Sequence, residues 1–350
     1  MELRVALVST PHVSVPPKGY GGTELIIAEL AQALTARGVE VVLYATGDSD
    51  VPGVEIRSNI PSARWPPDRR YERVLAAWAM RDIARDPRGF DIVHVHSPGA
   101  VEVSALSPYP VLCTLHHVLD PELTRLYEQH PDVRLVGISH AQARREPAGC
   151  FAVVHHGLDT SRYLPMEDQG YLLFLGRYDR CKGVKQAIEV AARANLPLVM
   201  AGAPHEREYF DSEVRPLMER HNVLDVGPVG GLRKARLIAR ARAVLFPIQW
   251  EEPFGLVMIE AMLSGVPVLA TARGSVPEII EDGVTGVICD DASEMVASAR
   301  IAERLFDRER IRLVARERWS ADRMAGDYLQ LYRRLAEQRP EPLELDAAGA

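Results

Sequence analysis

Short apolar runs alternate along the chain with longer amphipathic stretches, beginning at residue 3. Residues 3–8 are almost continuously apolar, as expected for a parallel strand that is buried on both faces. Residues 23–37 then place apolar side chains at helical spacing, and Gly38 ends the predicted helix. Further strands are predicted at residues 39–44, 91–96, 110–115, 135–138 and 151–154. This alternation predicts a parallel sheet covered by helices.

The pattern begins again after residue 170, which indicates a second domain of the same kind. A buried strand is predicted at residues 171–175 and a helix at residues 184–194. The remaining strands of this half are predicted at residues 196–201, 223–226, 243–246 and 266–270. Residues 157–170 have the composition of a linker. We therefore expect two α/β halves joined near residue 160, followed at residues 339–350 by a flexible tail rich in Pro and Glu.

Length and composition agree with this division. The 350 residues are too many for one ordinary core, and 47% of them are apolar. The net charge of −7 argues against a nucleic-acid partner, which usually requires a basic surface. The four cysteines show no CxxC spacing, so we expect neither a zinc site nor disulfides, and we expect a cytoplasmic protein. No apolar run reaches the ~18 residues that span a bilayer, and the first strand lacks the cleavage site of a signal peptide.

An arginine-rich segment at residues 57–88 leaves two interpretations open. It holds eight arginines against four acidic residues, together with Trp65 and Trp78. Such a segment could contact a membrane surface or an acidic acceptor. We favour an ordinary solvated helix and loop, so membrane contact is possible but not indicated.

Two loops that follow buried strands carry residues suited to a phosphate. Gly21 and Gly22 precede the first helix, where a bare backbone can approach a ligand and the helix N-terminus favours an anion. A plain tight turn without a ligand would have the same glycine pattern. The third glycine of the dinucleotide-binding fingerprint is missing, which argues against a dehydrogenase. Arg177 and Lys182 follow the strand at residues 171–175, where parallel sheets bind ligands. The forked guanidinium of Arg177 beside the compact charge of Lys182 suits a diphosphate. Without the other motifs, the same two residues would be interpreted as part of a solvated basic loop.

The most specific signal is the segment at residues 252–260, which we call the donor segment. Glu252 lies in the loop before a helix predicted at residues 255–263, and Glu260 lies inside that helix. At about 1.5 Å per residue, roughly 12 Å or less separates the two carboxylates. A sugar nucleotide has hydroxyls at both ends and phosphates between, which suits two carboxylates flanking a helix N-terminus. The residues of this segment that we expect to bind the donor are Glu252, Phe254, Gly255, Leu256 and Glu260.

Three histidines lie within or directly after predicted strands of the first half. His116 closes the strand at residues 110–115, where it either faces the ligand or is a hydrogen-bonded structural residue. His94 and His96 resemble half of a metal site, but no third ligand is evident. We therefore interpret these two as structural and expect no metal.

In this arrangement the chain resembles the retaining glycosyltransferases of family 4, also described as glycosyl transferases group 1. The resemblance covers residues 3 to about 290 in the correct order. Cys181 departs from the pattern, because the residue before the lysine is often acidic in such sequences. The motifs that carry the resemblance are Tyr20-Gly-Gly-Thr-Glu24, Val154-His-His-Gly-Leu-Asp159, Gly176-Arg177 with Lys182-Gly183, the donor segment, Gly274-Ser-Val-Pro-Glu278 and Glu281-Asp-Gly-Val-Thr-Gly286.

The resemblance implies the GT-B fold, in which two Rossmann-like, doubly wound domains face one another across a cleft. Residues 1–160 would form the acceptor domain and residues 161–320 the nucleotide-sugar donor domain, with a helix at residues 321–338 that crosses back to the first domain. By resemblance, Glu252 would face the donor sugar and Glu260 the ribose. Arg177 and Lys182 would hold the diphosphate, His116 would lie near the transferred sugar, and Gly21 and Gly22 would close on the phosphates.

The implied activity is transfer of a sugar, with retention, from a UDP- or GDP-type donor to a hydroxyl of a small molecule or glycan. The catalytic residues would be Glu252, His116, Arg177 and Lys182, without metal or other cofactor, and the acceptor would attack from the side of the departing phosphate. A sugar-nucleotide epimerase is an alternative, but it needs an acid/base pair that we do not find. A non-catalytic nucleotide-sugar-binding protein is another, and labelled donor would distinguish it.

Overall fold

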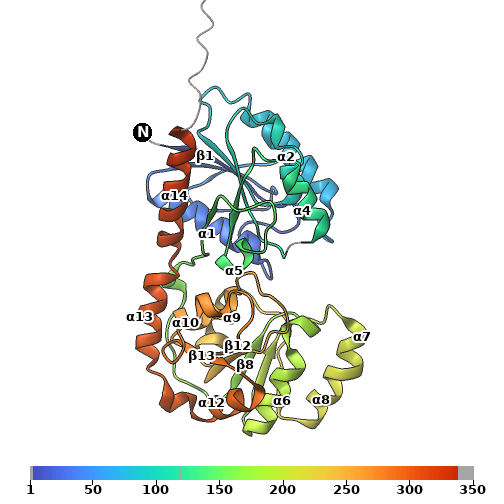
Figure 1. Cartoon of the computed structure of the whole chain (residues 1–350), viewed down its shortest axis with the longest axis vertical. Helices are drawn as coiled ribbons and strands as arrows, with labels where there is room; N and C mark the ends of the chain where they lie inside the picture. The colour runs from blue at the N-terminus through green and yellow to red at the C-terminus, as the bar shows by residue number, and fades with distance from the viewer. Residues whose placement is uncertain (1–2, 119, 338–350) are drawn as a thin grey trace, which may run out of the picture.

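The computed structural model describes residues 3–118 and 120–337, which form two α/β domains one above the other (Figure 1). The first domain is built on a seven-stranded sheet in the order β3-β2-β1-β4-β5-β6-β7, and its strand pairs are parallel. The chain winds in both directions from β1, so the strand order reverses between β1 and β4, where such sheets bind ligands. The strands are β1 (Arg4–Val8), β2 (Glu40–Tyr44), β3 (Glu55–Arg57), β4 (Ile92–Val95), β5 (Val111–Thr114), β6 (Arg134–Gly137) and β7 (Ala152–Val153).

Three helices of the first domain begin at a side chain that caps the first turn. Asp68 and Asp120 accept hydrogen bonds from backbone N–H groups of the first turns of α2 and α4, and Ser139 does the same for α5. The buried face of α1 includes Ile26, Leu30 and Leu34 at helical spacing. The helices are α1 (Gly22–Ala36), α2 (Arg69–Ile83), α3 (Pro98–Val101), α4 (Pro121–Glu128) and α5 (His140–Ala143).

The second domain holds a six-stranded parallel sheet in the order β10-β9-β8-β11-β12-β13. Its strands are β8 (Leu172–Leu175), β9 (Leu198–Ala201), β10 (Val223–Asp225), β11 (Ala243–Phe246), β12 (Val268–Thr271) and β13 (Gly286–Cys289). Its helices are α6 (Val184–Ala194), α7 (Arg207–Tyr209), α8 (Arg215–Arg220), α9 (Gly231–Ala239), α10 (Leu256–Leu263), α11 (Val276–Ile279), α12 (Ala292–Leu305) and α13 (Arg308–Arg318). The sequence pattern did not predict β3 or β13.

The last described helix, α14 (Ala321–Glu337), leaves the second domain and lies beside α1 of the first (Figure 1). Tyr332 Oη lies 2.7 Å from His94 Nδ1, and Tyr328 Oη lies 2.6 Å from Thr114 Oγ1. Thr114 Oγ1 also lies 2.7 Å from His94 Nε2, so both ring nitrogens of His94 have partners, in agreement with the structural role predicted for it. The predicted tail at residues 339–350, like residue 338, lies outside the described residues.

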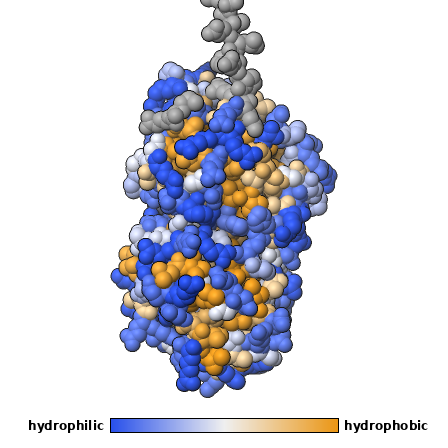
Figure 2. Space-filling model, turned by 60° about the vertical axis from the view of Figure 1, so that its left-hand side comes forward, coloured by the Kyte–Doolittle hydropathy of each residue, from blue (hydrophilic) through white to orange (hydrophobic). Residues whose placement is uncertain are grey.

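The chain passes between the domains at two neighbouring points. Leu158 N donates to Trp319 O at 2.9 Å, and Ala321 N donates to Leu158 O at 2.9 Å. The outgoing and returning segments are therefore bonded to each other. Figure 2 shows hydrophobic residues interspersed with hydrophilic ones on both domains, and mainly hydrophilic residues where the domains meet. Within residues 3–118 and 120–337, no helix combines the length and apolar character needed to cross a membrane.

Candidate functional site

The N-terminus of α10 is exposed to the other domain because Gly255 turns the chain sharply before it. Gly255 has φ 82°, a left-handed conformation that favours glycine. A Cβ there would lie 2.7 Å from Met258 Cε and 3.0 Å from Phe246 Cζ, so the packing also excludes a side chain. The first turn of α10 therefore presents backbone N–H groups beside the loop that carries Glu252.

Glu252 is buried and held by two donors. Lys182 Nζ lies 2.6 Å from Glu252 Oε2, and Trp250 Nε1 donates to the same oxygen at 2.8 Å. The ammonium group also lies 4.7 Å from the centre of the Trp250 ring, in a cation–π contact. Lys182 stands in a short turn after β8, and Gly183 follows it in a left-handed conformation at φ 73°. A Cβ on Gly183 would overlap the carbonyl of Pro247, so this glycine lets the Lys182 turn pack against the end of β11.

The backbone of Glu252 is fixed by the loop before α11. Ser275 N donates to Glu252 O at 2.9 Å, and Ser275 Oγ donates to Phe254 O at 2.7 Å. Gly274 has φ 58°, and a Cβ on it would overlap both the N and the O atoms of Glu252. The motif at residues 274–278 thus supports the donor segment through its backbone.

Glu260 is 2% exposed and also has two donors. Lys234 Nζ lies 2.5 Å and Tyr163 Oη 3.1 Å from Glu260 Oε1. Neither partner was predicted from the sequence: Lys234 is one of three cations on α9, and Tyr163 lies in the segment predicted to be only a linker. Two ends of the donor segment therefore each pair a carboxylate with a lysine.

A further buried carboxylate, Glu29 on α1, lies near this end of the site. Its oxygens accept from Asp159 N at 2.7 Å and pair with Arg162 at 3.2 Å. Burial raises the pKa of Glu29 to about 7, against the opposing effect of the Arg162 charge, and the nearby charge of Glu260 adds to the increase.

The glycine loop before α1 lies against the second domain. The position of a Cβ on Gly22 is 3.4 Å from Leu256 Cδ1, at the start of α10. The position of a Cβ on Gly230 is 3.3 Å from Gly19 Cα, at the start of α9. The structure thus brings Gly22 to the start of α10 in the donor segment across the domain boundary, whereas the Cβ position of Gly21 is closest to Pro17, Glu24 and Val13 of its own domain.

His116 reaches the donor segment through a series of rings. Its Nε2 lies 3.0 Å from His96 Nδ1, and its ring stacks on His156 with centroids 5.4 Å apart. His156 in turn packs edge-on against Phe254 at 4.8 Å. Burial, followed by the neighbouring imidazoles, holds the pKa of His116 well below its ordinary value, so the ring is neutral near pH 7.

Arg177, which was predicted to hold the diphosphate together with Lys182, does not share the contacts of Lys182 in the structure. Arg177 Nε lies 3.1 Å from Asp179 Oδ2, and its side chain is 32% exposed. The structure therefore places Lys182 in direct contact with Glu252, while Arg177 is paired with its own loop.

Two groups of residues bear on the question of metals. Asp290 and Asp291 are exposed, and Asp291 caps α12 by accepting from Ser293 N and Glu294 N. Among the described residues, a group able to hold an ion is formed by His140, His155 and Glu278, whose ligand atoms lie within 4.8 Å of one another.

Both halves of the chain match known protein families. Residues 160–320 match the family model "Glycosyl transferases group 1", and residues 20–162 match "Glycosyltransferase Family 4". The chain is 28% identical to a D-inositol 3-phosphate glycosyltransferase of Mycobacterium avium (strain 104), over 81% of this chain and 80% of that protein.

Solved structures of glycosyltransferases are also similar to this chain. AviGT4, a glycosyltransferase involved in avilamycin A biosynthesis, superposes with a TM-score of 0.76 at 29% identity, over 96% of this chain and 99% of its own. HepE of Anabaena, solved in complex with UDP-glucose, superposes with a TM-score of 0.72 at 19% identity, over 95% and 100%. These likenesses confirm the predicted GT-B fold.

Proposed function

Because this chain belongs to the glycosyltransferases, with a group 1 carboxyl-terminal half and a family 4 amino-terminal half, we propose that it transfers a sugar with retention from a nucleoside-diphosphate sugar to a hydroxyl acceptor. The observation that carries this proposal is the Lys182–Glu252 pair, 2.6 Å long, beside the N-terminus of α10. A cation, a carboxylate and the backbone N–H groups of a helix N-terminus in one place match the phosphates and hydroxyls of such a donor.

The diphosphate is the leaving group, and its growing negative charge is what the site must stabilise. Lys182 is already oriented by Glu252 and Trp250, so little reorganisation is needed when the charge develops. Arg177 would leave Asp179 to add a second cation. These groups together would replace a divalent metal, and no other cofactor is required.

Retention follows from front-face attack by the acceptor, with the departing phosphate taking the acceptor's proton. Glu252 is engaged by Lys182 and Trp250, which suits it to hold hydroxyls of the sugar rather than to act as a nucleophile. His116 is neutral, so it would donate or accept a hydrogen bond near the sugar without competing with Lys182 for the phosphates. Closure of the domains would exclude water and align the two substrates.

The relatives support particular substrate classes. HepE was solved with UDP-glucose, and a nucleotide-sugar donor of the UDP or GDP type is what we propose for this chain. The Mycobacterium avium relative is named for D-inositol 3-phosphate, which is a small polyol, and this supports a hydroxyl acceptor of the small-molecule or glycan type. Glu260, with Lys234 and Tyr163, would hold the ribose of the nucleotide.

The test is incubation of the full chain with radiolabelled UDP-glucose, UDP-N-acetylglucosamine or GDP-mannose, in excess EDTA, with inositol phosphates or short glycans as acceptors. We expect nucleoside diphosphate and a product with the donor's anomeric configuration, read by proton NMR. An inverted product would refute retention, and dependence on added manganese would refute metal-independent catalysis. Tight donor binding without any sugar transfer or donor hydrolysis would point to a binding protein.

A further inference from the structure

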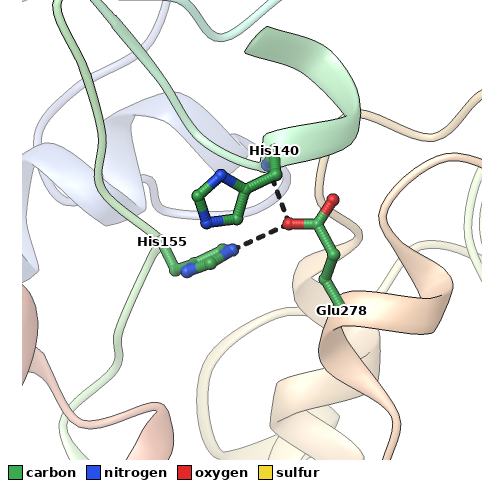
Figure 3. A group of neighbouring side chains, drawn as sticks. All are labelled: His140, His155 and Glu278. Carbon is green, nitrogen blue, oxygen red and sulfur yellow. Dashed lines mark hydrogen bonds and ion pairs between the residues drawn. The ribbon is translucent and has the colours of Figure 1, made fainter. Parts of the chain in front are cut away.

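Three side chains from separate parts of the fold converge, as Figure 3 shows. The ring of His155 also lies 6.2 Å from the ring of Phe254, which belongs to the donor segment. His140 begins α5, His155 follows β7, and Glu278 belongs to α11 of the second domain. Their ligand atoms all lie within 4.8 Å of one another. The group therefore spans the domain boundary, with two imidazoles on one side and one carboxylate on the other.

Hydrogen bonds explain part of this arrangement. Glu278 Oε2 accepts from His140 N at 2.7 Å and lies 3.0 Å from His155 Nε2, and Glu278 Oε1 accepts from Ala141 N at 2.6 Å. These contacts use the backbone of His140 and not its ring. The exposed His140 imidazole instead lies beside the His155 ring, with centroids 5.5 Å apart, on the same side as the carboxylate (Figure 3).

We propose that His140, His155 and Glu278 form a binding site for a divalent transition metal of the zinc class, which bridges the two domains. Two histidines and one glutamate are a ligand set that zinc uses when it keeps its fourth position for water. Tetrahedral bonds of about 2.0–2.1 Å place ligand atoms roughly 3.3 Å apart, so the widest separations must contract by up to about 1.5 Å. The distance of 3.0 Å between His155 Nε2 and Glu278 Oε2 needs only a slight widening. The exposed ring of His140 is free to make that movement by rotating about its side-chain bonds.

The ion would take the place of the hydrogen bond between His155 Nε2 and Glu278 Oε2. His155 Nε2 must be unprotonated to bind the metal, so binding releases any proton held there to solvent. Glu278 can keep its two backbone hydrogen bonds, because a carboxylate has about four lone-pair sites. The donors are nitrogen and oxygen, which favour zinc, nickel or cobalt over calcium or magnesium.

A metal bound here ties the domains together. It would stabilise the closed arrangement in which the Gly22 loop meets α10, and it would slow the reopening that releases product. The ion is therefore an inhibitor of turnover and not a participant in the chemistry. This role is separate from the proposed metal-independent sugar transfer, which we expect to proceed in excess EDTA.

The experiment measures Zn²⁺ binding directly, by calorimetry with the metal-free full chain, alongside the melting temperature. We expect one ion per chain and a higher melting temperature with zinc. His140→Ala keeps the backbone N–H that bonds Glu278 but removes one ligand, so zinc affinity should fall at least tenfold and the thermal effect should disappear. His205→Ala, which removes an exposed histidine outside the group, is the matched control and should bind zinc normally.

The same chains are then assayed with and without zinc, each against its own EDTA-treated rate. Zinc should slow the unaltered chain and the His205→Ala variant, but not His140→Ala. No binding at about 100 µM Zn²⁺, or binding that His140→Ala leaves unchanged, would overturn the site. Zinc binding that depends on His140 without any loss of rate would overturn the proposed inhibition of turnover by the metal. The calorimetric result stands whether or not the proposed sugar transfer is found.

Discussion

Lys182 and Glu252, which lie 70 residues apart, form an ion pair 2.6 Å long that joins the loop after β8 to the loop before α10. The pair is mostly shielded from solvent, since the side chains are 16% and 8% exposed. Each partner therefore depends on the other, because an unpaired charge in such a place is costly. A donor that inserts its phosphate and sugar hydroxyls here would find both groups already oriented.

Replacing Lys182 should lower kcat strongly. Lys182→Ala removes a cation beside the developing charge of the leaving group, which corresponds to ~3 kcal/mol, or about a hundredfold in kcat. The melting temperature should fall modestly, because Glu252 keeps only Trp250 as a side-chain donor. Lys185→Ala, which breaks a more exposed pair with Glu213 one turn along, is the control and should change neither quantity appreciably. A near-normal kcat for Lys182→Ala would refute the assignment.

The two carboxylates of the donor segment should differ in what they bind. Glu260→Gln should weaken both the intact donor and free UDP, because a ribose contact is the same in ground and transition state. Glu252→Gln should leave UDP binding nearly intact and lower kcat. Titrating both variants with UDP and measuring steady-state rates makes the comparison. Equal losses of UDP affinity would mean that the donor lies in the opposite direction.

Glu29 should make stability depend on pH. Its folded pKa of about 7 exceeds the ordinary 4.5, so the folded state binds the proton more tightly. This contribution is fully present below the ordinary pKa and is lost as the pH rises through about 7, by on the order of 3 kcal/mol. The free energy of unfolding in urea should therefore fall between about pH 5 and pH 8 by more in the unaltered chain than in Glu29→Gln. Parallel curves would show that Arg162 keeps Glu29 charged throughout.

The strands that the sequence predicted best are those buried on both faces. The strands β1 and β8 are almost continuous apolar runs, and a run of this kind can be recognised as a buried strand from the local sequence alone. The edge strand β3 has three partly exposed residues, and β13 begins at a glycine within a loop motif. Neither strand has a sequence pattern that distinguishes it from a loop. Each is recognised as a strand only by its hydrogen bonds to the neighbouring strand.

The same limit applies to the site. Glu252 and Glu260 were predicted because they stand at a fixed spacing around one helix start, which is a local feature. The partners of Glu260 were not: Tyr163 is 97 residues from Glu260, and Lys234 is 26 residues from it. A contact of this kind is set by how the linker and α9 pack on α10, and no periodicity in the sequence records it. His140 and Glu278 meet across the domains for the same reason.

Gly274 offers the sharpest test that backbone support positions Glu252. Gly274→Ala adds a Cβ that would overlap the N and O atoms of Glu252, at a φ of 58° that already disfavours a side chain. Gly283→Ala is the matched control, because Gly283 has φ 74° but nothing within 4 Å of its Cβ position. Both variants pay a similar conformational cost of about 1 kcal/mol. Only Gly274→Ala should displace Glu252, and so lower kcat by a further tenfold or more. The measurement is kcat for each variant, compared at temperatures equally far below their melting points. Equal activity of the two would show that Glu252 does not depend on the loop before α11.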